Sequence, residues 1–399
     1  MTGSDVVGPA TTVERLQPFS VNIFAKMSAL AASLGAVNLG QGFPDEDGPP
    51  AMLDAARQAI ADGVNQYPPG LGIVELREAI AAQRLRRYGQ QFDPDNEVLV
   101  TVGASEAIAS AVIGLVEPGS EVIVIEPHFD TYAPNIAMAG GHRVAVPLVR
   151  DGRGFALDAD AVRAAITPRT RALIVNSPHN PTGMVLSDDE CRGLAEVAVE
   201  ADLLVISDEV YERLTFDGRT HVPLATYPGM AERTVTISSA SKMFNCTGWK
   251  IGWACGTTEL VAGVRAAKQY LSYVGGAPFQ PAIAYALNHE DVWVDALRDS
   301  LQAKRDRLAG ALTGLGFDVH DSAGTYFLCA DPRPLGFDDG TAFCEELPHR
   351  AGVAAIPMSA FCDPSVEHPE WSHLVRFAFC KRDETLDEAI RRLGALTLP

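Results

Sequence analysis

The stretch Thr234–Trp253, TVTISSASKMFNCTGWKIGW, decides the fold. It begins with Thr234–Ser238, a β-branched run that is typical of a strand buried within a sheet. Small and apolar residues follow, and among them are two lysines, Lys242 and Lys250. Burial and a neighbouring cation both lower the pKa of a lysine amine, which makes it a nucleophile able to form an imine. From this stretch alone, a lysine that extends its amine to solvent is still the commoner explanation.

Working outward, short apolar runs alternate with helical patterns from about residue 97 onward. The expected strands are Glu97–Val102, Glu121–Ile125, Arg143–Leu148, Arg171–Asn176, Leu203–Ser207 and Thr234–Ser238. The expected helices between them are Ala104–Val116, Ala159–Ile166 and Asp188–Glu200. Strands this uniformly apolar are buried on both faces, as in a mainly parallel sheet covered by helices. The sequence therefore predicts an α/β fold.

The pattern changes beyond about Ala282 and predicts a smaller α+β domain. Its expected elements are a helix around Val292–Leu315, then Phe317–His320, Tyr326–Ala330, Thr341–His349, Val353–Pro357, Val375–Cys380 and a helix near Leu386–Leu396. We expect three parts: residues 1–47, packing with the small domain; the large domain, 48–282; and the small domain, 283–399. The first dozen residues, rich in Gly, Thr, Ser and Pro, are expected to be disordered.

Composition excludes several classes of protein. The 399 residues carry a formal charge of −19, and such an acidic surface repels nucleic-acid phosphates and anionic lipid. No apolar run approaches the roughly 18 residues that a membrane helix needs, and the first residues, MTGSDVVGPATTVERL, show no basic region followed by an apolar one. The seven cysteines, odd in number and without a CxxC pair, indicate reduced core residues of a cytoplasmic protein. The nine histidines show no metal-ligand spacing, so no metal is expected.

Polar clusters follow the ends of four predicted strands. Gly103-Ala104-Ser105 opens a helix, where free N–H groups favour an anion. Asn180 lies in the turn-forming stretch SPHNPTG, and Asp208 and Tyr211 follow the next strand. Taken singly, these clusters are explained equally well by packing, a turn or a helix cap. Together with Lys242 at the same sheet edge, they provide the imine-forming amine, acid, amide, phenol and anion site that pyridoxal phosphate requires.

The motifs Ser239-Ala240-Ser241-Lys242 and Gly248-Trp249-Lys250 resemble those of the fold type I, class I/II aminotransferases. The resemblance covers nearly the whole chain, from Asn38–Asp45 (NLGQGFPD) to Val375-Arg376-Phe377. It implies a pyridoxal-phosphate enzyme, a seven-stranded sheet and a homodimer. Within the family, the chain is similar to the kynurenine and glutamine transaminase branch. It is most similar to the actinobacterial N-succinyldiaminopimelate aminotransferases, through Gln66–Gly70 (QYPPG) and Ala267–Gly276 (AKQYLSYVGG).

The resemblance implies how the cofactor is held. Lys242 forms the imine with its aldehyde and then moves the proton, while Asp208 pairs with the ring nitrogen. Tyr211 and Asn180 bond the ring oxygen, and Phe129 stacks on the ring. The phosphate lies on the backbone of Ala104 and Ser105 and on the side chains of Ser239 and Lys250, with Tyr67 reaching it from the neighbouring subunit.

The substrate-binding residues implied by the resemblance are Arg376, Gly42, Asn180 and Phe24. Arg376 holds the α-carboxylate with two parallel bonds, helped by the backbone of Gly42 and by Asn180. From the residues alone, a structural ion pair is the commoner explanation of Arg376, and packing is the commoner explanation of Phe129 and Tyr67.

Two departures from the kynurenine-type pattern bear on the substrate. His128 replaces a residue that is often aromatic, and Gly275-Gly276 stand where relatives that prefer aryl substrates carry a larger side chain. We interpret both as favouring a long, multiply charged donor, whose distal carboxylate needs a cation such as Lys26 or Lys268. The expected reaction is therefore N-succinyl-L,L-diaminopimelate:2-oxoglutarate transamination in lysine biosynthesis.

Other functions remain open. A transaminase of broad specificity for glutamine, kynurenine or methionine, and a carbon–sulfur β-lyase, would use the same cofactor chemistry. A non-enzymatic regulator would need a DNA-binding module, and neither a basic patch nor room for one before residue 38 is present. A dinucleotide-binding oxidoreductase is disfavoured because Gly70-Leu71-Gly72 lacks a third glycine and does not follow a strand.

Overall fold

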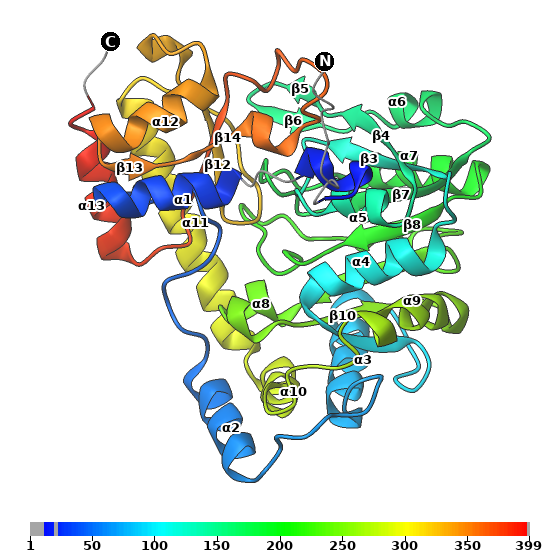
Figure 1. Cartoon of the computed structure of the whole chain (residues 1–399). Coiled ribbons are helices and arrows are strands. Elements are labelled where there is room, and N and C mark those ends of the chain that lie inside the picture. Colours follow the sequence, from blue (N-terminus) through cyan, green and yellow to red (C-terminus); the bar gives the residue numbers. More distant parts are fainter. Residues whose placement is uncertain (1–11, 20–22, 397–399) are drawn as a thin grey trace, which may run out of the picture.

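A computed structural model of the chain describes residues 12–19 and 23–396 (Figure 1). The first dozen residues, expected to be disordered, lie outside the described part except for Thr12. The helices are α1 Ile23–Leu34, α2 Pro50–Ala61, α3 Val74–Tyr88, α4 Gly103–Leu115, α5 Tyr132–Met138, α6 Ala159–Ala164, α7 Asp188–Glu200, α8 Ala240–Met243, α9 Thr258–Leu271, α10 Phe279–His289, α11 Asp291–Gly314, α12 Gly340–Arg350 and α13 Asp383–Leu393. The strands are β1 Val37–Asn38, β2 Val98–Val102, β3 Glu121–Glu126, β4 His142–Pro147, β5 Val149–Asp151, β6 Gly154–Ala156, β7 Thr170–Asn176, β8 Leu204–Asp208, β9 Thr234–Ser239, β10 Ile251–Cys255, β11 Asp318–Val319, β12 Phe327–Asp331, β13 Val353–Ala354, β14 Ile356–Pro357 and β15 Val375–Ala378.

A seven-stranded sheet forms the centre of the fold, in the order β2-β10-β9-β8-β7-β3-β4. Only β10 runs antiparallel to its neighbours, so the expected mainly parallel sheet is confirmed. Successive residues of a strand point to opposite faces. In β3, Val122 and Val124 pack with α4, α5 and α9, whereas Ile123 and Ile125 pack with α6 and α7. Both faces of the sheet are thus covered, as the apolar strands predicted.

Two details of the predicted strands were wrong. Ile251–Cys255 was not expected as a strand, yet it enters the sheet as β10, paired with β2 and β9. Val353–Pro357 was expected as one element, but the structure divides it into β13, which pairs with β1, and β14, which pairs with β15. Strand pairing across long sequence separations decided both cases, and a local pattern does not contain that information.

The C-terminal region forms a second sheet of four strands, in the order β11-β12-β15-β14. The described N-terminal segment joins this region, because β1 pairs in parallel with β13 and Val37 N–H donates to the Gly352 carbonyl. Helix α11 runs along the same side of the molecule as this group (Figure 1). The boundaries near residues 47 and 282 stay a prediction. This arrangement places Arg376, on β15, opposite the ends of the strands of the large sheet.

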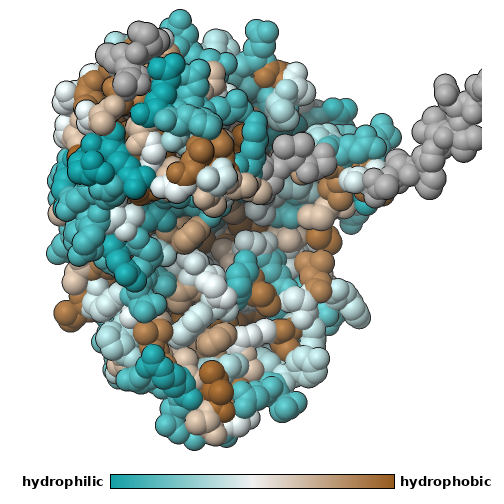
Figure 2. Space-filling model, turned by 60° about the vertical axis from the view of Figure 1, so that its left-hand side comes forward, coloured by the Kyte–Doolittle hydropathy of each residue, from teal (hydrophilic) through white to brown (hydrophobic). Residues whose placement is uncertain are grey.

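All seven cysteines are buried and unpaired by disulfides. Within the described ranges, no helix is long and apolar enough to cross a membrane. Figure 2 shows one face of the molecule, on which hydrophilic and apolar side chains are mixed.

Candidate active site

A cavity of about 450 Å³ lies at the carboxyl ends of β7, β8 and β9. Parallel strands gather ligand-binding residues at this edge because the turns that follow them lie side by side. All the sequence-predicted site residues except Tyr67 line the cavity, namely Phe24, Gly42, Ala104, Ser105, Phe129, Asn180, Asp208, Tyr211, Ser239, Lys242, Lys250 and Arg376.

Lys242 occupies the short helix α8, directly after β9. Its amine donates to the hydroxyl of Tyr326 at 2.8 Å and to the carbonyl of Gly42 at 3.3 Å. Burial lowers the pKa of the amine to about 8. Roughly a tenth to a fifth of the amine is therefore neutral near physiological pH, far more than for an ordinary lysine, and the neutral amine is the form that attacks a carbonyl group.

Asp208 ends β8, and its buried carboxylate faces the cavity. Oδ2 accepts a hydrogen bond of 2.6 Å from the hydroxyl of Tyr132, and Oδ1 accepts one of 3.2 Å from the Val210 N–H. Burial raises the pKa of the carboxyl to about 6, against the opposing effect of the Tyr132 bond. A cationic group beside Asp208 would offset this cost of burial, as a protonated ring nitrogen does.

Asn180 and Tyr211 reach the cavity from the turns that follow β7 and β8. The Asn180 Oδ1 atom accepts a 2.8 Å bond from Arg376, so its amide N–H₂ group is left to donate elsewhere. The Asn176 side chain holds this turn by accepting from the Asn180 N–H and donating to the Asp208 carbonyl. Tyr211 is buried, with its ring edge-on to that of Tyr326.

The anion side of the cavity is formed by the start of α4 and by Lys250. Gly103 has φ +72°, and a Cβ atom added there would lie 3.2 Å from Cε and 3.3 Å from Nζ of Lys250. A Cβ atom on Gly252 would overlap the Gly103 backbone at 2.5 Å. These two glycines therefore let the lysine amine approach the helix N-terminus. Ser239 caps α8 through the Ser241 N–H and donates to the Ile251 carbonyl.

These residues fit pyridoxal phosphate. An amine with a lowered pKa, a buried carboxylate and a phenol converge on one cavity, and beside them a glycine-walled helix N-terminus with a lysine suits a phosphate. Lys242 would bond to the aldehyde carbon, and Asp208 would pair with the ring nitrogen. The side chains of Ser239 and Lys250, with the backbone of Ala104 and Ser105, would hold the phosphate.

Arg376 faces the other side of the cavity from β15. Its side chain is buried, donates to Asn180 Oδ1 and to the Gly40 carbonyl, and stacks on the ring of Phe327 at 3.8 Å. Within the described part of the chain, its Nε atom has no hydrogen-bond partner. Burial lowers the pKa of the guanidinium to about 10. A buried cation without a carboxylate partner is suited to bind one from a ligand.

Sequence reasoning missed several residues at the cavity. Tyr326 links the two sides, because it bonds Lys242 and also donates to the Gly42 carbonyl at 2.5 Å. Tyr132 holds Asp208, and Phe361 packs on Arg376. Asp130, beside Phe129, also lines the cavity, and burial raises the pKa of its carboxyl. Of these residues, Asp130 had a local signal because it follows Phe129, and Tyr326 because it begins the expected element Tyr326–Ala330.

Tyr67 lies outside the cavity of its own chain. Its side chain is 82% exposed and meets the ring of Tyr273 edge-on at 5.7 Å. The two cations suggested for a distal carboxylate also lie outside the cavity lining. Lys26 pairs with Glu345 at 2.6 Å on the surface, and the buried Lys268 donates to the Gly70 carbonyl.

The two departures from the kynurenine-type pattern have local packing explanations. A Cβ atom on Gly275 would lie 2.8 Å from the Val102 side chain, and one on Gly276 would lie 2.2 Å from that of Ile251. Close packing favours glycine at both positions, and the φ of +64° at Gly276 favours it further, while neither glycine lines the cavity. His128 is buried against Tyr132, and burial lowers its pKa to about 4.

Outside the cavity, Glu126, Cys362 and His368 bring three potential metal-ligand atoms within 4.8 Å of one another. His368 Nδ1 lies 3.4 Å from a Glu126 oxygen, and the Asp363 N–H donates to the other oxygen. Cys362 donates from Sγ to the Met358 carbonyl, so each of the three side chains has a contact within the protein.

The chain matches known proteins over almost its whole length. Residues 35–393 match the family model of aminotransferase class I and II. The probable N-succinyldiaminopimelate aminotransferase DapC of Mycobacterium tuberculosis is 72% identical over 390 residues, covering 96% of this chain and 98% of that protein. The methionine aminotransferase of Escherichia coli is 38% identical and covers 97% of this chain and 99% of its own.

Solved structures agree with these matches. The N-succinyldiaminopimelate aminotransferase of M. tuberculosis superposes with a TM-score of 0.95, covering 97% of this chain and 100% of its own at 72% identity. The E. coli methionine aminotransferase superposes with a TM-score of 0.92 at 38% identity, covering 97% of this chain and 100% of its own. Fold, cavity and relatives lead to one conclusion: the chain belongs to the class I and II aminotransferases, enzymes that depend on pyridoxal phosphate.

Proposed function

We propose that this aminotransferase transfers the amino group of N-succinyl-L,L-diaminopimelate to 2-oxoglutarate in lysine biosynthesis. The observation that carries the proposal is the 72% identity over nearly the full length to a relative named for this substrate. The cavity supports the transamination step, because an amine of lowered pKa and a buried guanidinium with a free Nε–H line its opposite sides.

Each side of the cavity has its own task in the proposed reaction. Arg376 binds the α-carboxylate of the donor, and the carbonyl of Gly40 and Asn180 Oδ1 fix the orientation of the guanidinium. The rings of Phe24, Phe327 and Phe361 exclude water from this contact and so strengthen it. Donor and acceptor each have an α-carboxylate, so Arg376 serves both halves of the reaction.

Lys242 moves the proton. Its Nζ atom, with a pKa of about 8, takes the proton from Cα of the donor in the first half of the reaction. In the second half it delivers a proton to Cα of the acceptor. When bound, pyridoxal phosphate supplies an electron-withdrawing ring that stabilises the charge developing at Cα. Tyr132 fixes the Asp208 carboxylate, which would pair with the ring nitrogen. Tyr326 and the Gly42 carbonyl hold the lysine amine between proton transfers.

The proposal includes a homodimer in the cytoplasm. Among the described residues that line the cavity, the cations are Lys242, Lys250 and Arg376, and each already has a role. A distal carboxylate therefore needs a cation from elsewhere, such as a second subunit. The side chains of Tyr67 and Tyr270 are 82% and 85% exposed, which supports a subunit interface at the surface where they lie.

The cytoplasmic location is supported by the cysteines, because buried thiols without disulfides are typical of a reducing compartment.

The substrate proposal is tested by an absorbance titration of the cofactor-loaded protein. Adding N-succinyl-L,L-diaminopimelate should convert the visible band of the cofactor to that of its amino form, and 2-oxoglutarate should restore it. The Lys242→Ala variant should show neither change. A protein that responds to glutamine, kynurenine or methionine and not to the succinylated donor would show that the substrate assignment is wrong.

The shared site is tested by mixing two inactive variants, Lys242→Ala and Tyr67→Ala. If Tyr67 serves the neighbouring subunit, each mixed dimer contains one intact site, and random mixing restores about a quarter of the wild-type activity. No recovery in a preparation shown to contain mixed dimers would contradict sharing of the site.

A broad-specificity transaminase is the second candidate. Besides Phe129, assigned above to the cofactor ring, the phenylalanines that line the cavity are Phe24, Phe43, Phe327 and Phe361, and they would favour aromatic or thioether donors. Relatives named for methionine and kynurenine are also similar to the chain, though at lower identity. Comparing kcat/KM for the succinylated donor, methionine and kynurenine separates the two candidates.

The β-lyase alternative has its own test. Pyruvate release from a cysteine S-conjugate without an oxo-acid acceptor would reveal this activity.

A further inference from the structure

The turn after β8 has a front and a rear. Asp208 and Tyr211 face the cavity, whereas Glu209 and Glu212, the residues that directly follow each of them, are fully buried on the other side. The two pairs of side chains share one short stretch of backbone. A shift of Glu209 or Glu212 therefore also moves Asp208 and Tyr211.

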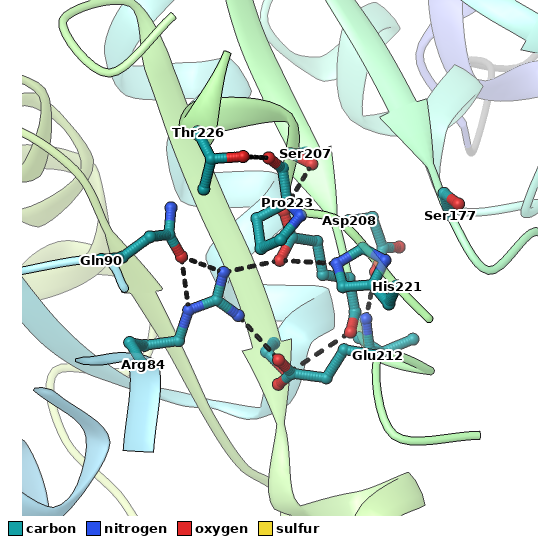
Figure 3. A network of polar contacts seen from close by, with 12 residues as sticks. Arg84, Gln90, Ser177, Ser207, Asp208, Glu212, His221, Pro223 and Thr226 are labelled. Carbon is teal, nitrogen blue, oxygen red and sulfur yellow. Dashed lines mark hydrogen bonds and ion pairs between the residues drawn. The ribbon is translucent and has the colours of Figure 1, made fainter. Parts of the chain in front are cut away.

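One guanidinium joins both rear carboxylates. Arg84, on α3 and fully buried, donates from Nη2 to Glu209 Oε2 and from Nη1 to Glu212 Oε2, each at 2.7 Å, and from Nε to Gln90 Oε1 at 2.8 Å (Figure 3). Its guanidinium also lies over the ring of Tyr88 at 4.5 Å. Three acceptors around one guanidinium match the forked donors of arginine, which an ammonium group cannot reproduce.

The remaining carboxylate oxygens are also bonded. Ser207 donates to Glu209 Oε1 at 3.0 Å, and Ser238, on the adjacent strand, donates to Glu212 Oε1 at 2.6 Å. Nε2 of His221 lies 3.1 Å from Glu209 Oε2. The cluster thus ties α3, β8, β9 and the turn after β8 into one buried unit. Its ionisable members are Arg84, Glu209, Glu212, His221 and Tyr88, with the thiol of Cys255 facing Arg84 from β10.

The charge of Glu209 affects Asp208, a residue of the cavity. Burial alone would raise the pKa of Glu209, but Arg84 and His221 lower it to about 2, so Glu209 is anionic. Burial is the main cause of the raised pKa of the neighbouring Asp208, and the negative charge of Glu209 raises it further. An added negative charge at this place favours a proton on whatever basic nitrogen faces Asp208.

We propose that Arg84, Glu209 and Glu212 are positioning residues for the cofactor. They fix the turn that presents Asp208 and Tyr211, and the charge of Glu209 helps to retain the proton on the ring nitrogen. The contribution is electrostatic and geometric, and none of the three side chains lines the cavity. The proposal rests on the cofactor roles assigned above to Asp208 and Tyr211, and it is independent of which amino donor the enzyme uses.

The first experiment is a pH titration of the visible absorbance band in the cofactor-loaded Glu209→Gln variant, without any amino donor. The amide has the shape of the carboxylate and removes only the charge. We expect the spectral pKa to fall by on the order of half a unit or more, because the protonated form of the bound cofactor loses a favourable anion. Omitting the donor separates this result from the substrate proposal.

The second variant, Arg84→Lys, keeps the positive charge but lacks the several N–H donors with which the guanidinium bonds Glu209, Glu212 and Gln90. It should release the cofactor about tenfold faster than the wild type, as measured by transfer of the cofactor to an excess of an apo-enzyme acceptor. If Arg84→Lys does not fold, the spectral pKa of Glu209→Gln still decides the proposal.

Glu121→Gln is the matched control. Glu121 is also a buried carboxylate bonded to an arginine, Arg169, and to hydroxyl groups, but it begins β3 at the opposite edge of the sheet. This variant should lower the thermal midpoint and leave both the spectral pKa and cofactor release unchanged. A Glu209→Gln variant that behaves like Glu121→Gln, less stable but with the wild-type spectral pKa, overturns the proposal and makes the cluster purely structural.

Discussion

The two sides of the cavity are built differently. The cofactor side comes from turns that follow consecutive strands of one sheet, so Asp208, Ser239 and Lys242 are placed by local structure and parallel pairing. On the substrate side, Gly42 and Phe24 meet Arg376, which lies more than 330 residues away along the chain. The difference indicates that the chemistry resides in a compact motif, whereas substrate recognition depends on how the C-terminal sheet docks against the large one.

Lys242→Ala should have the largest effect, and it acts on the cofactor side. Loss of the proton carrier alone lowers the rate by about 10²–10⁴-fold, and loss of the covalent attachment adds to that. The measurement is the single-turnover rate of cofactor conversion with donor in excess. Arg192→Ala, which removes a surface ion pair with Asp188, is the control and should retain wild-type activity.

Arg376→Lys tests the substrate side. The variant keeps a cation but loses the forked pair of donors, so kcat/KM for the amino donor should fall by about 10²–10³-fold, equivalent to ~3–4 kcal/mol. The visible spectrum and the affinity for the cofactor should remain those of the wild type. A variant that loses the cofactor instead would show that the two sides are not separable in this way.

The lowered pKa of Lys242 predicts a pH dependence of cofactor binding. Only the neutral amine reacts, and its pKa without the cofactor is about 8. The rate of reconstitution of the apo-enzyme should therefore rise about tenfold for each pH unit well below 8 and level off above it. Stopped-flow absorbance between pH 6 and 9 measures the profile, and a midpoint near the ordinary lysine value of 10.5 would contradict it.

Tyr326→Phe should have the smallest effect, and it acts on the contact between the two sides. It removes the hydroxyl that bonds both Lys242 Nζ and the Gly42 carbonyl. A hydrogen bond to a charged group contributes about 1.5–3 kcal/mol, so kcat should fall by roughly tenfold or more, with KM changed much less. Steady-state kinetics at saturating acceptor separates the two constants. An unchanged kcat would mean that Tyr326 only fills space.

Local pattern predicted the elements that depend on nearby residues. The six predicted strands of the large sheet appear within one or two residues of their expected bounds, and Asp188–Glu200 is a helix with those bounds. The strand Ile251–Cys255 was missed because its pairing partners, β2 and β9, decide that it is extended. Tyr132 was missed because it reaches Asp208 from 76 residues away, across the sheet edge.

The sequence by itself determined the α/β sheet, the edge at which the polar turns gather, and the motif around Lys242, because apolar periodicity and turn chemistry are local properties. Tertiary structure alone decided which partners those residues meet. Arg376 stacks on Phe327, Tyr326 joins Lys242 to Gly42, and Arg84 holds the rear of the turn that bears Asp208. The pKa values of Lys242, Asp208 and Arg376 depend on how deeply these groups are buried and how far they lie from other charges. The order of residues along the chain does not specify either quantity.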